Sequence, residues 1–172
     1  PLVEDHALAA LGWRRPPPPV AAADPDLPIA VVGSLSKRFW GGLRVGFVRA
    51  PAPVALRIAR VKATQDLGSS AVGQVLAERL LRDPSSAAAL VVRTAELRRR
   101  HRALAAALAA QLPSWSWPEP AVGLSLWVDT GRPVAEALAQ AALRHGVAVA
   151  TAASLSPHPE RHPRHLRLSF SA

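Results

Sequence analysis

The sequence predicts an α/β fold, and three features of the chain support this prediction. The run Ile29–Val32 is apolar and rich in β-branched residues, which is typical of a buried strand. Apolar residues recur at helical spacing between residues 53 and 112. Residues 123–170 follow the order strand, helix, strand, strand, which is typical of a small α/β domain.

In the N-terminal half, a proline-rich connection at residues 14–28 precedes the buried strand. A glycine-containing loop then leads to a second strand, predicted at residues 43–48. One or two helices are predicted between Pro53 and Arg82, with a break at residues 66–70, where Gly and Ser cluster.

In the C-terminal half, Asp83 and the residues after it form a helix start signal, and a long Ala- and Arg-rich helix is predicted as far as Leu112. The predicted elements that follow are a strand at 123–129, a helix at 133–145 that stops at Gly146, and strands at 147–151 and 165–170.

Lys37 is the strongest candidate for a catalytic residue. It lies in GSLSKRFWGGLRVG, residues 33–46, and Lys62 is the only other lysine in a chain that otherwise uses arginine. A lysine amine can lose its proton and attack a carbonyl carbon to form a Schiff base, whereas a guanidinium stays charged. The segment therefore predicts a nucleophilic lysine.

The residues around Lys37 suit a phosphorylated aldehyde cofactor. Ser34 and Ser36 offer hydroxyl groups, and Arg44 offers a planar set of donors that can bind a phosphate with two hydrogen bonds. We expect Lys37 to lie on a strand-to-strand loop with these ligands on either side of it.

The segment VVGSLSKRFWGGLRVGFVRAP resembles the lysine-bearing segment of class I/II aminotransferases, which are pyridoxal-phosphate-dependent enzymes of fold type I. Within them it is most similar to the aminotransferase-like domain of MocR-type regulators in the GntR family and to related enzymes. The resemblance implies that Lys37 carries pyridoxal 5′-phosphate as a Schiff base and that Ser34 and Arg44 bind its phosphate. Ser36 is a weaker match.

Two further segments extend the resemblance over nearly the whole chain. In VEDHALAAL, residues 3–11, Asp5 matches the aspartate that faces the pyridine nitrogen, where a carboxylate keeps the ring protonated. In RHLRLSFSA, residues 164–172, Arg167 matches the arginine that binds the substrate carboxylate, and Arg164 is the less favoured alternative.

The resemblance also implies a domain organisation. Residues 1–84 correspond to the C-terminal part of the large cofactor-binding domain, and residues 85–172 correspond to the linking helix and the small domain. The chain begins with proline and contains no methionine, which predicts a fragment of a longer protein.

One departure from the family pattern concerns a tyrosine that normally follows the aspartate and contacts the phenolic oxygen of the cofactor. Ala7 or Leu8 stands in that region, and the chain contains no tyrosine. His6 is a weak substitute, because neighbouring residues on a strand point to opposite faces. The departure mildly favours a cofactor-sensing role over turnover.

Composition predicts a cytoplasmic protein without metal or membrane chemistry. Cysteine is absent, which excludes disulfides and cysteine metal sites, and the apolar runs are too short and interrupted for a membrane span. His158, His162 and His165 lie in a proline-rich loop, where no metal site is expected. The net charge of +9 is spread along the chain, so the basic cluster at residues 98–102 is expected to be a solvated helix face.

The function implied by the resemblance is amino-group transfer between an amino acid and a keto acid in a homodimer, with the freed amine of Lys37 as general base. One alternative is the effector-sensing domain of a GntR/MocR-type transcription regulator, with DNA bound only by an N-terminal domain outside this sequence. A second alternative is a non-catalytic remnant or interaction module that binds no cofactor.

Overall fold

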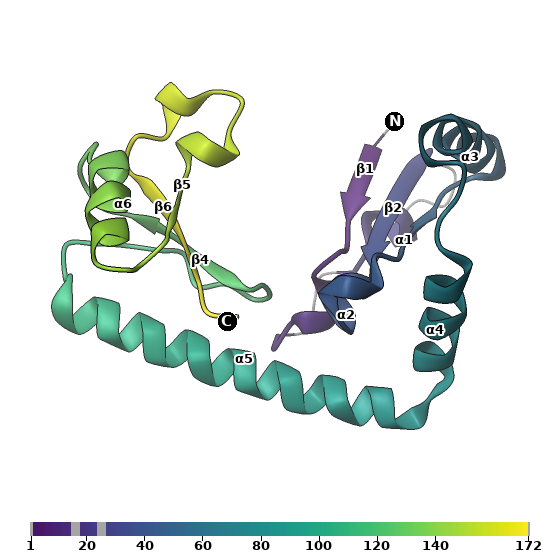
Figure 1. Cartoon of the computed structure of the whole chain (residues 1–172), viewed down its shortest axis with the longest axis horizontal. Coiled ribbons are helices and arrows are strands. Elements are labelled where there is room, and N and C mark those ends of the chain that lie inside the picture. The colour runs from purple at the N-terminus through teal and green to yellow at the C-terminus, as the bar shows by residue number, and fades with distance from the viewer. Residues whose placement is uncertain (1, 15–17, 24–26, 172) are drawn as a thin grey trace. The chain divides into compact units, whose positions relative to one another are not determined.

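The computed structural model describes residues 2–14, 18–23 and 27–171 (Figure 1). The chain divides into two compact units, Pro1–Thr94 and Ala95–Ala172, and the division falls inside helix α5 (Pro84–Gln111). Each unit combines a sheet with helices, so the prediction of an α/β fold is confirmed. In the described part of the chain, no helix is both long and apolar enough to cross a membrane.

Unit 1 is built on a three-stranded sheet in the order β1-β2-β3. Its strands are β1 (Leu2–Asp5), β2 (Ile29–Ser34) and β3 (Gly46–Arg49). Strand β1 is parallel to β2, which requires a crossover connection, and α1 (Val20–Ala23) and a 3₁₀ turn at Ala9–Leu11 lie in this connection. Strand β3 is antiparallel to β2. The apolar run of β2 is buried, as its composition predicts.

The segment after β2 differs from its prediction. Leu35–Arg38 form the one-turn helix α2 because the Ser34 side chain caps the turn, so Lys37 lies on a helix and not on a loop. A 3₁₀ turn at Gly41–Leu43 then occupies the start of the predicted second strand. For this reason β3 begins only at Gly46.

The predicted break between two helices is confirmed in unit 1. Helix α3 (Ala52–Asp66) is followed by Leu67 and Gly68, both with positive φ, and α4 (Ala71–Arg82) begins after Ser70, whose Oγ accepts a hydrogen bond from the Gly73 N–H. A small apolar cluster links α4 to the segment between β2 and β3; it consists of Leu35, Leu43 and Ala77, with Phe39, Val45 and Leu80 packed against them.

Unit 2 has an antiparallel sheet in the order β4-β6-β5. Its elements are β4 (Ser125–Asp129), α6 (Ala135–Arg144), β5 (Ala150–Thr151), 3₁₀ turns at Ala153–Leu155 and Pro159–Arg161, and β6 (His165–Ser169). The predicted order of strands and helix is confirmed, but β5 is shorter than predicted. The Val147 N–H donates to the Ala142 carbonyl, so Val147 still belongs to the turn that ends α6, and the strand begins only at Ala150.

The core of unit 2 lies on one face of this sheet. Leu126, Val128 and Leu166 are at most 2% exposed, and α5 contributes Leu97, His101 and Leu108. Within the basic cluster at residues 98–102, Arg98, Arg99 and Arg102 are exposed, as expected for a solvated face, whereas His101 is buried. Its ring meets the Phe170 ring edge to face, at a centroid distance of 5.5 Å.

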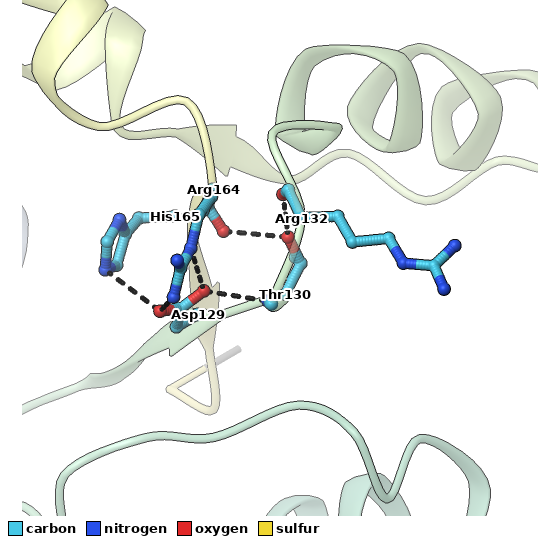
Figure 2. A network of polar contacts seen from close by, with 6 residues as sticks. Asp129, Thr130, Arg132, Arg164 and His165 are labelled. Atoms are coloured by element: carbon cyan, nitrogen blue, oxygen red, sulfur yellow. Dashed lines mark hydrogen bonds and ion pairs between the residues drawn. The ribbon is translucent and has the colours of Figure 1, made fainter.

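Asp129 joins the end of β4 to the segment that enters β6 (Figure 2). Its carboxylate accepts two hydrogen bonds from the Arg164 guanidinium, one of them from Nε at 2.9 Å. The Thr130 N–H donates to the Arg164 carbonyl at 2.9 Å. Hydrogen bonds from Arg164 and from the Gly131 N–H lower the pKa of Asp129 from 3.8 to about 2.

We expect the substitution Asp129→Asn to make the protein less sensitive to acid. Because the pKa of this carboxyl is lowered on folding, ionised Asp129 stabilises the fold above about pH 4, and this contribution disappears as the pH falls towards 2. Urea unfolding between about pH 5 and pH 2 should show the stability of the two proteins converging. Glu136→Gln, at an exposed position on α6, is the control. A constant difference at all pH values would contradict the prediction.

Candidate active site

Four of the predicted site residues gather at one end of the sheet in unit 1. Asp5 ends β1 and pairs with Val32, while Ser34 ends β2. Because β1 and β2 are parallel and β3 is antiparallel to β2, the carboxyl ends of the first two strands meet the amino end of the third. Lys37 follows β2 at this end, and Arg44 precedes β3.

Lys37 is exposed on α2, and its backbone is held in place by its neighbours. The Ser34 Oγ accepts a hydrogen bond from the Lys37 N–H at 3.3 Å. The N–H groups of Leu35 and Ser36 donate to the Val45 carbonyl at 3.0 and 3.3 Å, and both side chains are buried. The lysine amine is therefore accessible on a fixed backbone.

The Asp5 carboxylate is exposed and oriented by the chain that follows it. Its Oδ1 accepts a hydrogen bond from the Ala7 N–H at 2.7 Å. His6 turns to Glu4, with 3.0 Å between His6 Nε2 and Glu4 Oε1. The histidine considered as a substitute for the family tyrosine thus has a partner on β1.

Arg44 has a left-handed backbone conformation, with φ 51° and ψ 33°. This conformation costs a non-glycine residue on the order of 1–2 kcal/mol. Arg44 is exposed and lies just before the start of β3. Strain of this kind is concentrated at functional sites.

Unit 2 carries Arg167 on the face of its sheet opposite the core. Arg167 pairs with Trp127 on β4 and with Ala150 on β5, so the three residues share that face. The Trp127 ring stacks on His165 at a centroid distance of 5.5 Å. Arg164 is held by Asp129, so Arg167 is the better candidate for binding a substrate carboxylate.

Two residues that the sequence analysis did not single out make polar contacts of structural consequence. Asp129 holds Arg164, and its position before a Thr-Gly turn at the end of a strand could have indicated a structural carboxylate. Arg93 donates from Nη1 to the carbonyls of Arg38 and Phe39, at 3.1 and 2.9 Å. Nothing in the sequence distinguishes Arg93 from the other arginines of its helix.

The polar groups gathered in unit 1 fit a ligand that combines an aldehyde, a phosphate and a basic ring nitrogen. An amine suits an aldehyde, a guanidinium with a hydroxyl suits a phosphate, and a carboxylate suits a basic ring nitrogen. Among the residues that the structure describes, no three or more His, Cys, Asp or Glu side chains are arranged to hold a metal ion.

The fold of this chain is similar to that of solved structures over nearly all of its residues. The kynurenine aminotransferase of Pyrococcus horikoshii, solved with PMP, has a TM-score of 0.89 and 22% identity, over 99% of this chain and 43% of that one. The α-aminoadipate aminotransferase LysN of Thermus thermophilus has a TM-score of 0.85 and 25% identity, over 98% of this chain and 44% of that one. The chain thus spans less than half the length of these structures.

Two curated relatives are uncharacterized HTH-type transcriptional regulators of Bacillus subtilis (strain 168). YisV is 39% identical over 75 residues, and YdfD is 37% identical over 79 residues. These alignments cover 43% and 45% of this chain and 16% of each relative. The family model described as aminotransferase class I and II matches residues 2–172. Because this match extends over nearly the whole chain, the protein belongs to the class I and II aminotransferase family.

Proposed function

We propose that this chain supplies the lysine-bearing part of a pyridoxal-phosphate-dependent aminotransferase that moves an amino group between an amino acid and a keto acid. The gathering of Asp5, Ser34, Lys37 and Arg44 at one end of a sheet is the observation that carries the proposal. The complexes of two structural relatives with PMP and with N-(5′-phosphopyridoxyl)-L-leucine support the choice of cofactor.

Lys37 is the catalytic residue of this proposal. Bound pyridoxal phosphate supplies an aldehyde carbon for covalent attachment and a protonated ring that withdraws electrons from the substrate. The Lys37 amine would hold this carbon and, when free, would act as the general base that takes the proton from the substrate Cα. Its accessible position on a fixed backbone suits both tasks.

Ser34 and Arg44 are proposed to hold the phosphate. The Ser34 Oγ already accepts a hydrogen bond from the Lys37 N–H, and its own hydroxyl proton remains to be donated to a phosphate oxygen. The Arg44 guanidinium adds a positive charge and a pair of N–H donors. Ser34 and Arg44 would thus bind the phosphate close to the backbone that carries Lys37.

Asp5 is proposed to bind the ring nitrogen of the cofactor, and Arg167 is proposed to bind the carboxylate of the substrate. The Asp5 carboxylate, oriented by the Ala7 N–H, would keep a ring nitrogen protonated. The Arg167 guanidinium would bind the substrate carboxylate from the exposed face of the sheet in unit 2. We further propose a cytoplasmic homodimer, as the resemblance to the family implies.

A second candidate function is the effector-sensing domain of a transcription regulator. The similarity to YisV and YdfD favours it, and so does the absence of tyrosine near Asp5. In this case DNA would be bound by a separate N-terminal domain. Formation of a keto acid from an amino acid by the full-length protein would distinguish the enzyme from the sensor.

Borohydride reduction in the presence of pyridoxal phosphate, followed by peptide mass mapping, tests the site. We expect Lys37 to be labelled about ten times more readily than Lys62, because Lys37 lies in the proposed phosphate site and the Lys62 amine is paired with Asp66 on α3. Asp5→Asn should weaken the labelling, and Lys37→Ala should abolish it. Equal labelling of both lysines would favour the non-catalytic alternative.

Two substitutions of Arg44 should differ in stability but have the same effect on cofactor binding. Arg44→Gly relieves the left-handed conformation and should raise the free energy of unfolding by about 1 kcal/mol relative to Arg44→Ala. Both variants should lose affinity for pyridoxal phosphate equally, because both lack the guanidinium. Urea unfolding and a fluorescence titration measure the two quantities. A glycine variant less stable than the alanine variant would contradict this account of Arg44.

Arg167 should determine whether the protein distinguishes an amino acid from the amine that lacks its carboxylate. Arg167→Ala should reduce the preference on the order of 10- to 100-fold, the value of a charge-assisted hydrogen bond. Arg132→Ala is the matched control, since its guanidinium points away from the polar network (Figure 2). The measurement is the affinity of the full-length protein for both compounds, and an unchanged preference would exclude Arg167 from this role.

A further inference from the structure

The helix that carries Lys37 is too short to be stable by itself. Helix α2 has four residues, and its turn is closed by a hydrogen bond from the Phe39 N–H to the Leu35 carbonyl at 2.8 Å. Forming a first helical turn is unfavourable, because several backbone angles are fixed for a single hydrogen bond. The orientation of Lys37 therefore depends on what holds α2 from outside.

The amino end of α2 is held by the polypeptide next to it. The Leu35 and Ser36 N–H groups donate to the Val45 carbonyl, and Leu35 packs in the apolar cluster of unit 1. The Ser34 hydroxyl caps the turn. These contacts fix where α2 begins, but the last carbonyl groups of a helix need partners as well.

Arg93 meets this need at the carboxyl end of α2. Its Nη1 lies 3.1 Å from the Arg38 carbonyl oxygen and 2.9 Å from the Phe39 carbonyl oxygen, in a partly buried position. Arg38 directly follows Lys37 in the chain. A guanidinium forms stronger hydrogen bonds to carbonyl oxygens than a neutral donor does, and its planar shape fixes the direction of the contact.

Other arginines of α5 make a different kind of contact. Arg99 and Arg100 pair with Glu96 on their own helix, and these hydrogen bonds lower the pKa of Glu96 to about 2. Arg93 instead reaches backbone atoms more than 50 residues away in the sequence. Its contact is a tertiary one, made to the turn that presents the candidate catalytic amine.

We propose that Arg93 is a positioning residue for Lys37. By holding the carbonyls of Arg38 and Phe39, it keeps α2 closed and fixes the direction in which the lysine side chain leaves the backbone. The proposal rests on the proposed function, in which the Lys37 amine binds the cofactor aldehyde.

Two measurements on the full-length protein test this role. The first is amide hydrogen exchange at single-residue resolution without cofactor, in the wild type and in Arg93→Ala. We expect exchange at the Phe39 N–H to become about tenfold faster, while amides of the β1–β2 ladder stay unchanged. The second is borohydride labelling with pyridoxal phosphate, in which the preference for Lys37 over Lys62 should fall about tenfold.

The variants separate positioning from general destabilisation. Arg93→Lys keeps the charge without the planar donor and should recover part of both effects, and Arg98→Ala, at an exposed position on the same helix, should behave as the wild type. If Arg93→Ala does not fold, Arg93→Lys and Arg93→Gln provide the same comparison.

The outcomes are distinct for the two proposals. A change in only one of the two measurements, or in neither, would overturn the role of Arg93 while leaving the proposed function intact. If wild-type Lys37 shows no preference over Lys62, the proposed function fails, and the exchange data still decide whether Arg93 holds α2.

Discussion

Strand β2 is hydrogen-bonded along both edges, and the candidate site in unit 1 depends on these two pairings. The parallel ladder with β1 sets Asp5 beside Val32, and the antiparallel ladder with β3 brings the Val45 carbonyl to the first N–H groups of α2. A slip of one residue in either ladder would turn every side chain of that strand to the other face. Burial of Ile29, Ala30 and Val31 opposes such a slip.

Much of the secondary structure could be predicted because its signals are local. The end of α3 and the start of α4 are encoded by Gly68 and Ser70, and the start of α5 by Asp83, whose Oδ1 accepts a hydrogen bond from the Ser85 N–H. The one-turn helix α2 could not be predicted from periodicity, since four residues contain too little of it. Its ends are hydrogen-bonded to Val45 and Arg93, which lie outside the helix.

In the candidate site, too, residues with a local sequence signal could be predicted, whereas contacts between distant residues could not. Lys37 stands out because lysine is rare in this chain, and the segment around it contains the chemistry of a phosphate site. The preference for Arg167 over Arg164 rests in the sequence only on the resemblance, because both arginines lie in the same short segment. The partner of Arg164 could not be predicted, because Asp129 lies on a strand 35 residues earlier.

The two pairings of β2 also differ in how much chain must be ordered before they form. Ser34 and Gly46 are close in sequence, whereas Asp5 and Val32 are separated by the whole crossover connection. The entropic cost of closing a loop rises with the logarithm of its length, so the pairing of β1 with β2 costs only about 0.7 kcal/mol more than the pairing of β2 with β3. The longer loop nevertheless slows the formation of native contacts. The hairpin that bears Ser34, Lys37 and Arg44 can thus assemble before Asp5 arrives. During folding, Ser34, Lys37 and Arg44 would be in register earlier than the Asp5 carboxylate.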